Sequence, residues 1–386
     1  MVAWRTRVAL MGATGSIGSQ TIDVLRREPG RFELVALAGG HRVDELAAIV
    51  NEFHVTSVGV SDDEDRRRLS ALVGNVDIVI GEKGLRELAA SADVVVNAVM
   101  GFAGLPVTLA TLEAGARLAL ANKESLIAAA PLVAKARSTP GAQILPVDSE
   151  HCAIHQCLIG SIEPGHPDVA RLLLTASGGP FRDWDAQQLS RITKADALAH
   201  PTWSMGPKIT IDSSTLMNKG LEVLEASALF GIEVERIDVV VHPQSIVHSM
   251  VEYVDGSVLA QLSAPDMRLP IAYCLGSPAR LAHHWGQLDF TQSLTLDFHA
   301  PDRDAFPALD LAYAAANRGG AAPAWLSAAN EVCVQAFLED RIRWMDIVPL
   351  VARTMDDYED DALANLDAVV ANDARARRIT HGNLPQ

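Results

Sequence analysis

Short apolar runs alternate with amphipathic segments from Arg7 to about Val147. The runs are rich in β-branched residues and apolar at almost every position, which is typical of parallel strands buried on both faces of a sheet. The segments between them repeat apolar residues at helical spacing. The pattern predicts a doubly wound, Rossmann-like α/β domain. Its strands are expected in RVALMG, FELVALAGG, TSVGV, VDIVI, ADVVVNAVMG, RLALAN and QILPVD.

The pattern changes after Glu150. Turns rich in glycine and proline precede a long helical segment, expected from about Ser214 to Phe230. The alternating segments IDVVVHP and SIVHSMVEYVDGSVLAQLS follow, and the Asp255-Gly256 pair inside the second is a strong hairpin signal. This part predicts a central α+β domain with antiparallel strand pairing.

The rest of the chain lacks strand alternation. A turn-rich stretch precedes alanine-rich segments with helical periodicity. We predict an α/β domain over residues 1–147, an α+β domain over 148–276, a connector over 277–303 and a C-terminal helical domain over 304–386.

Composition restricts the class of partner. The 386 residues carry a net charge of −16, which argues against a broad nucleic-acid-binding face or a polybasic membrane anchor. The four cysteines form no CxxC pair, which suits a reducing compartment. No apolar run reaches the ~18 residues of a membrane span, and the first one is too short for a signal peptide. We expect a cytoplasmic protein without nucleic-acid or membrane partners, which meets anionic ligands with locally placed cations.

A glycine-rich turn joins the first predicted strand to the first predicted helix. In VALMGATGSIGSQTIDVL, Gly12, Gly15 and Gly18 have GxxGxxG rather than GxGxxG spacing. This spacing still allows a tight turn, a close approach to a pyrophosphate and a helix N-terminus that faces the anion. We predict a dinucleotide site here; the alternative is a turn with no ligand.

The end of the second strand bears on the choice of cofactor. An NAD site usually ends this strand with an acid that binds the ribose 2′-hydroxyl, whereas this strand ends in ALAGGHR. Gly39 and Gly40 leave room, and His41 and Arg42 could meet a 2′-phosphate, which favours NADPH over NADH. The alternative is that Arg42 is a solvated residue before the next helix.

Two carboxylates stand at the end of the last predicted strand. In LPVDSEHCAIH, Asp148 and Glu150 are two residues apart. On a continuing strand both side chains would point the same way, at the sheet edge where open α/β folds bind ligands. Two hard oxygen donors suit Mg²⁺ or Mn²⁺. The pair fits equally well the N-terminal flank of a helix without a metal.

A third carboxylate lies on the predicted helix. At 3.6 residues per turn, Asn218, Lys219 and Glu222 share a polar arc that carries an amide, an ammonium and a carboxylate. The alternative for this arc is a solvated face with an ordinary ion pair. The opposite arc is apolar and is expected to face a core; it contains Met217, Leu221, Leu224 and Ala228.

Two turns near this helix offer a place for a phosphate group. Ser177 and two glycines follow a strand in LTASGGPF, and Ser213 comes just before the helix that carries Asn218 and Lys219. Together they could neutralise a small phosphate ester. The alternative is a pair of ordinary turns and a helix N-cap.

The segment AHPTWSMGPK, in a loop over about residues 198–208, is bounded by proline and glycine. It contributes His200, Trp203 and Met205, and it could cover a bound substrate and exclude water. The alternative is that Trp203 anchors a core.

Taken in order, these motifs resemble those of 1-deoxy-D-xylulose 5-phosphate reductoisomerases. The resemblance runs over nearly the whole chain. Its motifs are GATGSIG, ANKESL, LPVDSEH, ASGGPF, HPTWSMGPKITIDSSTLMNKGLE, HPQSIVHSMVEYVDGSVLAQLSAPDMRLPI and AANEVCVQAFL.

The resemblance implies an NADPH-dependent oxidoreductase of the non-mevalonate isoprenoid pathway that uses Mg²⁺ or Mn²⁺. The expected reaction converts 1-deoxy-D-xylulose 5-phosphate to 2-C-methyl-D-erythritol 4-phosphate by rearrangement and hydride reduction. Retro-aldol cleavage and recombination is the route that the family favours, and a concerted α-ketol shift stays open. The resemblance also implies a homodimer with NADPH-binding, catalytic and C-terminal helical domains in each subunit.

The resemblance further implies roles for single residues. The expected metal ligands are Asp148, Glu150 and Glu222, and these three with Lys123 form the catalytic set. The expected substrate contacts are Lys123, Ser149, Glu150, Ser177, His200, Trp203, Ser213, Asn218, Lys219 and Glu222, with Met205 on the same loop. The expected cofactor contacts are Thr14, Gly15, Ser16, Ile17, Gly39, Gly40, His41, Arg42, Asn122, Lys123, Glu124, Gly206 and Met267.

Two points stay open in this comparison. His41 departs from many members of the family, in which lysine follows the glycine. The role of Lys123, either charge sharing or proton transfer, is also open.

Two other functions compete with this one. Another NADPH-linked dehydrogenase, of the semialdehyde or homoserine type, would need neither the three carboxylates nor the tryptophan loop. A non-catalytic dinucleotide sensor would not need Asp148, Glu150, Lys219 and Glu222 all intact.

Overall fold

The computed structural model describes residues 5–160, 166–203, 205–359 and 363–385. Residue 204, within the predicted substrate loop, lies outside the described residues, as do 360–362 and 386 in the predicted helical domain. Two compact units are present. Unit 1 comprises Met1–Ser125, Pro131–Ser149 and Asp266–Trp285, and unit 2 comprises Leu126–Ala130, Glu150–Pro265 and Gly286–Gln386. The predicted domain boundaries stay a prediction.

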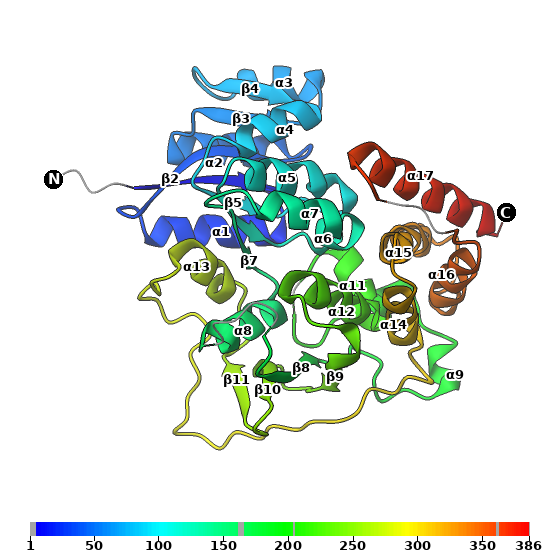
Figure 1. Ribbon diagram of the computed structural model, residues 1–386. Coiled ribbons are helices and arrows are strands. Elements are labelled where there is room, and N and C mark those ends of the chain that lie inside the picture. The colour runs from blue at the N-terminus through cyan, green and yellow to red at the C-terminus, as the bar shows by residue number, and fades with distance from the viewer. Residues whose placement is uncertain (1–4, 161–165, 204, 360–362, 386) are drawn as a thin grey trace. The chain divides into compact units, whose positions relative to one another are not determined.

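Unit 1 contains a seven-stranded sheet in the order β4-β3-β2-β1-β5-β6-β7 (Figure 1). Every neighbouring pair of strands in it is parallel. The strands are β1 (Thr6–Met11), β2 (Phe32–Ala38), β3 (Ser57–Val60), β4 (Asp77–Ile80), β5 (Val94–Asn97), β6 (Arg117–Leu120) and β7 (Gln143–Pro146). The order reverses direction at β1, which is the arrangement of a doubly wound sheet, so the predicted α/β fold is confirmed.

Helices cover both faces of this sheet (Figure 1). They are α1 (Ser16–Arg27), α2 (Val43–Phe53), α3 (Asp63–Ser70), α4 (Gly81–Ala89), α5 (Leu105–Glu113), α6 (Lys123–Ala128), α7 (Ala130–Arg137) and α13 (Arg268–Gly276). One core cluster includes Met11 and Val95 from the strands with Leu88 and Val107 from α4 and α5. The helices bury apolar side chains against the strands, which explains why the strand sequences are apolar at nearly every position.

Unit 2 contains a four-stranded sheet in the order β11-β10-β8-β9. The strands are β8 (Val169–Ala176), β9 (Ile237–Val241), β10 (Val247–Tyr253) and β11 (Val258–Leu262). β10 pairs antiparallel with both β8 and β11, and the predicted hairpin turns at Asp255-Gly256, where Gly256 has φ +82°. β8 and β9 pair in parallel, which the sequence pattern did not predict. The chain between them passes through several helices, as a parallel connection requires.

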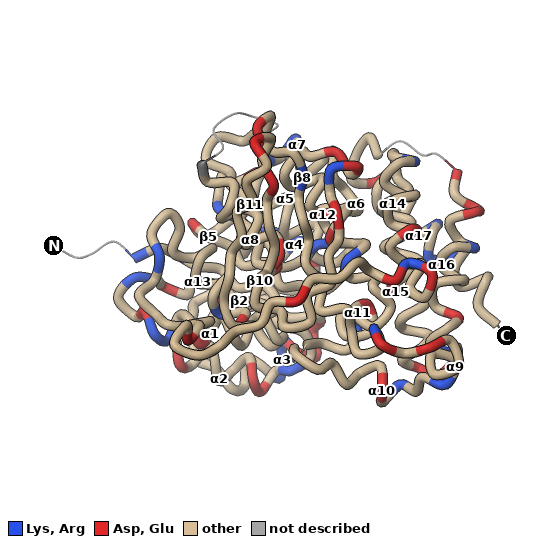
Figure 2. Tube along the Cα trace, turned by 90° about the horizontal axis from the view of Figure 1, so that it is seen from below, with Lys and Arg blue, Asp and Glu red and all other residues tan. Residues whose placement is uncertain are grey.

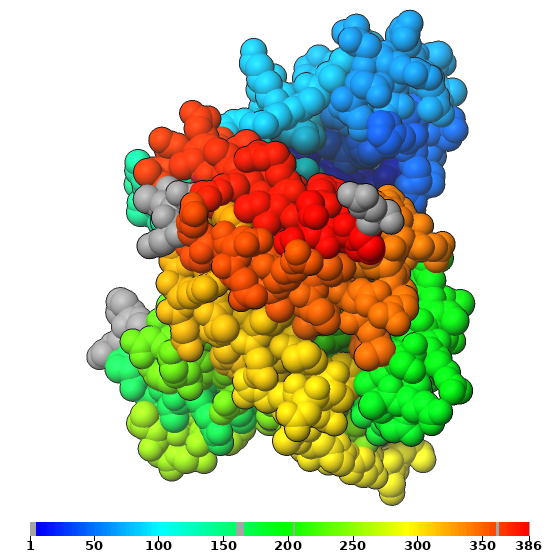
Figure 3. Space-filling view, turned by 90° about the vertical axis from the view of Figure 1, so that its right-hand side faces the viewer, coloured from blue at the N-terminus to red at the C-terminus, as the bar shows by residue number. Residues whose placement is uncertain are grey.

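Most helices of unit 2 pack around an apolar cluster that includes Met217, Leu221, Ala312 and Trp325, whereas α8 (Ser149–Cys157) contributes Ile154 to a second cluster with Val223 and Leu309. The helices of this unit are α8, α9 (Ala186–Leu189), α10 (Lys194–Leu198), α11 (Pro207–Ser214), α12 (Met217–Phe230), α14 (Ala308–Arg318), α15 (Ala322–Leu338), α16 (Ile347–Asp356) and α17 (Leu366–Asn383). α17, in red, lies on the surface (Figure 3). Short 3-10 helices occur at Gly101–Gly104, Leu158–Gly160, Val234–Arg236 and Trp344–Asp346.

The predicted helix from Ser214 to Phe230 is wrong at its start. α11 ends at Ser214, and α12 begins at Met217. Leu216 between them has φ +61°, a left-handed conformation that a helix cannot contain. No glycine or proline marks this break, so local sequence rules did not reveal it. Ala228 was also placed wrongly, because it is exposed whereas the other members of its arc are buried.

Charge and hydropathy agree with the composition. Acidic and basic residues are interspersed along the chain, as the red and blue segments show (Figure 2). Among the described residues, no helix is both long and apolar enough to cross a membrane.

Candidate active site

The first two candidate ligands lie where β7 leads into α8. β7 ends at Pro146 and α8 begins at Ser149, so Glu150 occupies the first helical turn and not a strand. The strand geometry expected for Asp148 and Glu150 is therefore wrong, and the helix-flank alternative describes the local structure. A carboxylate in a first turn interacts favourably with the helix dipole, which stabilises Glu150 in its charged form.

Two of the three residues in the polar arc of α12 are buried, and Asn218 is half-buried. Lys219 and Glu222 are 3% and 1% exposed, so the interpretation of this arc as a solvated face is wrong. Lys219 Nζ lies 2.9 Å from Glu150 Oε1 and also donates to the Glu222 carboxylate, which accepts a further hydrogen bond from the Asn218 amide. A buried ammonium that contacts two carboxylates indicates a site with an excess of negative charge.

Asp148 has its own cation. Lys123, the first residue of α6, donates from Nζ to Asp148 Oδ2 at 2.8 Å, and both side chains are largely buried. Asp148 is covalently joined to Glu150 through Ser149 alone, and one oxygen from each of Asp148, Glu150 and Glu222 lies within 4.8 Å of the others. Three carboxylates and two ammonium groups leave one negative charge, so a divalent cation suits this donor set.

A second group of possible ligands shares Asp148 and adds His151 and Glu225. His151 Nε2 contacts the backbone oxygen of Glu222 at 3.0 Å, and His151 and Glu225 are almost fully buried. The all-carboxylate group is the better site for Mg²⁺, because its ligands are all oxygens and Glu150 keeps 20% of its side chain exposed.

The two serines of the predicted phosphate site lie on neighbouring segments. Ser177 directly follows β8, and its Oγ accepts the N–H of Gly179 at 3.2 Å. A Cβ at Gly179 would lie 2.7 Å from the backbone oxygen of Ser213, so only glycine allows these segments to approach so closely. Ser213 belongs to the last turn of α11, and Asn218 and Lys219 follow in the first turn of α12. The structure thus brings the two serine segments together, and Asn218 and Lys219 follow Ser213 in the chain and contact Glu222 and Glu150.

His200 organises the predicted substrate loop. Its Nδ1 accepts the backbone N–H groups of Thr202 and Trp203 at 3.2 and 3.0 Å. Its Nε2 lies 3.2 Å from Ser177 Oγ. Nδ1 therefore carries no proton, and burial lowers the pKa of His200 below its ordinary value of 6.5. The neutral imidazole joins the loop to one of the predicted phosphate-binding residues.

Trp203 and Met205 are half-buried in the same loop. The Trp203 ring lies 6.1 Å from the imidazole of His248 on β10. Gly206 forms the N-cap of α11. Trp203 is therefore not a fully buried core anchor, and its predicted role over the substrate stays a prediction.

The glycine turn in unit 1 is built by close backbone contacts. Gly12 has φ +88°, and a Cβ there would lie 2.4 Å from the Ala98 oxygen. A Cβ at Gly18 would lie 2.3 Å from the Gly12 oxygen, so this glycine brings α1 against the end of β1. Gly15 caps α1, whose first turn carries no acidic side chain. Thr14, Ser16 and Ile17 also belong to this turn, which suits an anion.

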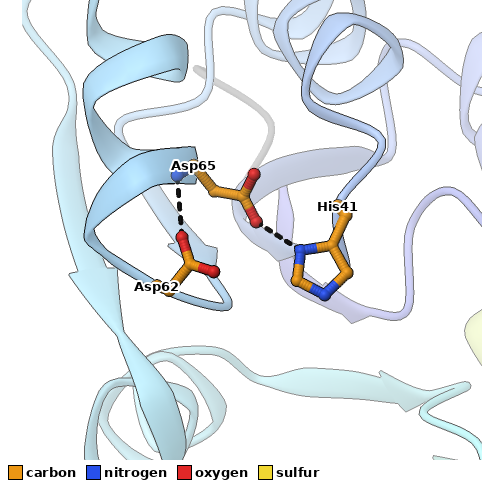
Figure 4. A group of neighbouring side chains, drawn as sticks. All are labelled: His41, Asp62 and Asp65. Atoms are coloured by element: carbon orange, nitrogen blue, oxygen red, sulfur yellow. Dashed lines mark hydrogen bonds and ion pairs between the residues drawn. The ribbon is translucent and has the colours of Figure 1, made fainter.

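The loop after β2 contains a contact that sequence analysis missed. His41 Nδ1 lies 2.7 Å from Oδ2 of Asp65 on α3 (Figure 4). Arg42 pairs with Glu45 at 3.3 Å. A Cβ at Gly39 would meet Leu46 at 2.9 Å, whereas Gly40 faces open space. Asp65 follows His41 by 24 residues, and no local motif marks the pair.

The remaining predicted cofactor residues lie on two segments, one leading from β6 into α6 and one leading into α13. Asn122 is buried and donates to the Val99 and Gly101 oxygens at 2.6 and 2.7 Å, so its amide holds the loop after β5. Glu124 follows Lys123 in α6 and is half-buried. Met267 is half-buried at the N-cap of α13, which an Arg268–Asp23 ion pair at 2.8 Å joins to α1.

Family models match three stretches of the chain. Residues 8–130 match the 1-deoxy-D-xylulose 5-phosphate reductoisomerase model, residues 144–230 its C-terminal domain model, and residues 262–379 the DXP reductoisomerase C-terminal domain model. The chain belongs to the 1-deoxy-D-xylulose 5-phosphate reductoisomerase family. A reductoisomerase of Heliobacterium modesticaldum is 49% identical over 97% of this chain and 96% of its own. One from a Synechococcus strain is 47% identical over 97% of each chain.

Solved reductoisomerase structures share the fold. The enzyme from Zymomonas mobilis in complex with NADPH superposes with a TM-score of 0.91 at 41% identity, over 98% of this chain and 99% of its own. A reductoisomerase in complex with NADPH, fosmidomycin and magnesium gives 0.91 at 42% identity, over 98% of each chain.

Proposed function

We infer that this chain is an NADP-dependent oxidoreductase that converts 1-deoxy-D-xylulose 5-phosphate to 2-C-methyl-D-erythritol 4-phosphate in isoprenoid precursor synthesis. The observation that carries this function is the carboxylate group Asp148, Glu150 and Glu222 with its two lysines. It occurs in a chain nearly half identical, over almost its full length, to reductoisomerases.

The three carboxylates are the proposed ligands of Mg²⁺ or Mn²⁺. A divalent cation held there supplies a Lewis acid for the rearrangement, and NADPH supplies the hydride for the reduction. Lys219 restrains Glu150 and Glu222, and Lys123 restrains Asp148, so the ligands are held in place before substrate binds.

The substrate phosphate is assigned to Ser177, Ser213, Asn218 and Lys219. These groups are neutral or cationic donors, and they lie at the ends of β8, α11 and α12. Ser149 is the proposed contact to the substrate hydroxyls. The His200 loop, with Trp203 and Met205, is proposed to cover the substrate and exclude water, which protects reactive enolate and aldehyde groups.

NADPH is assigned to the glycine turn and the segments beside it. The α1 N-terminus would face the pyrophosphate, and the loop after β2 would face the adenosine ribose. Met267 and Gly206 are proposed to lie near the nicotinamide end. Asn122 is proposed to act through its backbone, because its side chain is already engaged.

We further propose a cytoplasmic homodimer whose subunits have the three-domain organisation described above. Edge strand β11 supports a dimer, since Val258 and Leu259 are 46% and 50% exposed and Phe290, further along the chain, is 73% exposed. Exposed apolar side chains along an unpaired sheet edge favour association with a second copy.

The first experiment measures NADPH oxidation at about 340 nm with 1-deoxy-D-xylulose 5-phosphate, in the presence of Mg²⁺, of Mn²⁺ and of EDTA. We expect oxidation that needs both substrate and metal, and loss of activity in EDTA that either metal restores. Metal-independent oxidation of another substrate would favour another dehydrogenase. NADPH binding without turnover of this substrate would favour a sensor.

A further inference from the structure

Asp65 and His41 form a polar pair beside the expected ribose site. Asp65 Oδ2 lies 2.7 Å from His41 Nδ1, and because an ionised carboxylate only accepts hydrogen bonds, Nδ1 is the donor. The Asp65 side chain is 4% exposed and that of His41 is 74% exposed. The second ring nitrogen of His41 lies on the side away from both labelled carboxylates (Figure 4).

The Asp65 carboxylate is held in place. Asp62 Oδ1 accepts the backbone N–H groups of Glu64 and Asp65 at 2.9 Å, which fixes the first turn of α3. Arg68 Nη1 lies 3.7 Å from Asp65 Oδ1, so each carboxylate oxygen has a cationic or hydrogen-bonding partner. A buried carboxylate needs such partners, and here they limit the positions that the Asp65 side chain can take.

The position of the Asp65–His41 pair in the fold indicates what it could bind. His41 follows Gly39 and Gly40 at the carboxyl end of β2, where a Rossmann sheet receives the adenosine ribose. An NAD site uses an acid here to bind the 2′-hydroxyl. In this chain the acid is Asp65 from α3, and its carboxylate contacts His41. Arg42 pairs with the exposed Glu45 at 3.3 Å, whereas His41 pairs with the buried Asp65 carboxylate.

We propose that Asp65 is a positioning residue for cofactor selection: it orients the His41 imidazole so that Nε2 donates to the 2′-phosphate of NADPH. This proposal rests on the proposed function. Because the Nδ1–H group donates to Asp65, Nε2 can donate to the phosphate only when both ring nitrogens carry a proton, and the positive charge of that form suits a phosphate. With His41 in place, the carboxylate supports binding of the phosphate. Without His41, the same carboxylate would face the phosphate and repel it.

The test is titration calorimetry with 2′,5′-ADP, which carries the 2′-phosphate, and with ADP, which lacks it. The variants are D65N, H41A and the double variant, with D63N as control. Asp63 lies in the same helical turn, is 72% exposed and pairs with Arg66 instead. Loss of one oriented, charge-assisted hydrogen bond corresponds to roughly a tenfold rise in Kd.

We expect D65N to raise the Kd of 2′,5′-ADP about fivefold to tenfold. H41A should raise it further, and adding D65N to H41A should recover part of that loss. The Kd of ADP should change less than about twofold in every variant, and D63N should resemble the wild type. In turnover assays, D65N should raise KM for NADPH and leave kcat unchanged.

Three results would overturn the proposal. An equal loss for 2′,5′-ADP and ADP in D65N would assign Asp65 a structural role only. Tighter binding of 2′,5′-ADP by D65N would mean that the carboxylate opposes the phosphate even beneath His41. A wild-type protein that does not prefer 2′,5′-ADP to ADP would contradict the proposed NADPH dependence itself, whereas the first two results leave that function intact.

Discussion

At the scale of single residues, the candidate site depends on charges that compensate one another away from water. Lys219 is 3% exposed and contacts carboxylates from two helices, so removing its ammonium group would leave the buried Glu222 carboxylate without this cation. Such losses are costly, which makes conservative substitutions the informative ones. Substitution of Glu222 distinguishes between the two possible ligand groups, because Glu222 belongs to only one of them.

Replacing Glu222 with glutamine should lower kcat by about 100-fold or more, because a neutral amide is a poor ligand for Mg²⁺. NADPH affinity should stay near the wild-type value. The measurements are turnover against Mg²⁺ concentration and Mn²⁺ binding by calorimetry. Glu225→Gln is the matched control, since Glu225 is also buried on α12 but belongs to the other ligand group. Wild-type turnover of E222Q in excess Mg²⁺ would remove Glu222 from the ligand set.

His200 gives the loop a pH dependence with a defined sign. Burial lowers its pKa, so the fold favours the neutral form. The contribution of the neutral His200 side chain to the stability of the folded protein is complete above pH 6.5, the ordinary pKa of histidine. This contribution is lost as the pH falls through the lowered pKa. Protonation at Nδ1 would break its bonds to the Thr202 and Trp203 amides.

We therefore expect hydrogen exchange at the Thr202 and Trp203 amides, corrected for intrinsic chemistry, to quicken as pH falls below 6.5. In His200→Asn this increase in the exchange rate below pH 6.5 should be absent, because the asparagine amide does not titrate. The same increase in both proteins would mean that a group other than His200 causes the pH dependence.

At the scale of elements, α12 is the helix on which the site depends. It carries Asn218, Lys219 and Glu222 on one side and packs on α14 with the other. Gly220 allows this approach, since a Cβ there would lie 2.8 Å from Ala312 Cβ. Lys219 and Glu222 are buried because α12 has protein on both sides, not because the pattern of the helix itself is unusual.

Gly220→Ala should lower the stability of the protein. Alanine favours a helix interior over glycine by about 1 kcal/mol, but overpacking a well-packed core costs about 1–3 kcal/mol. A net loss of about 1 kcal/mol is expected from urea unfolding. Gly382→Ala on α17 is the control, because nothing lies within 4 Å of a Cβ there. Equal or higher stability of G220A would show that α14 shifts to accommodate the added methyl group without loss of stability.

At the scale of the whole molecule, the open question is assembly. The sheet of unit 2 ends at β11, and exposed apolar side chains on this strand and at Phe290 make it the proposed dimer surface. Unit 1 ends its sheet at β4 and β7 instead.

Sedimentation analysis should therefore give a dimer for the wild type and a monomer for Leu259→Asp, because a carboxylate on the sheet edge opposes pairing. Val370→Asp is the control: Val370 is 46% exposed, close to the 50% of Leu259, but it lies on α17. A dimeric L259D protein would place the interface elsewhere, and a monomeric wild type would contradict the dimer itself.

The sequence alone determined what depends on neighbouring residues. The seven parallel strands, the glycine turn before α1 and the hairpin at Asp255-Gly256 follow from period, turn chemistry and backbone sterics, and the structure has all of them. The resemblance to a family also came from ordered motifs and is confirmed.

Only the tertiary structure decided what depends on residues far apart in the chain. Glu150 meets Lys219 across 69 positions and His41 meets Asp65 across 24, and no local pattern encodes either contact. The left-handed conformation of Leu216 and the burial of Glu222 likewise depend on packing between segments that are far apart in the chain. Local rules describe what one segment prefers, whereas burial and electrostatic pairing are set by whichever segments fold against it.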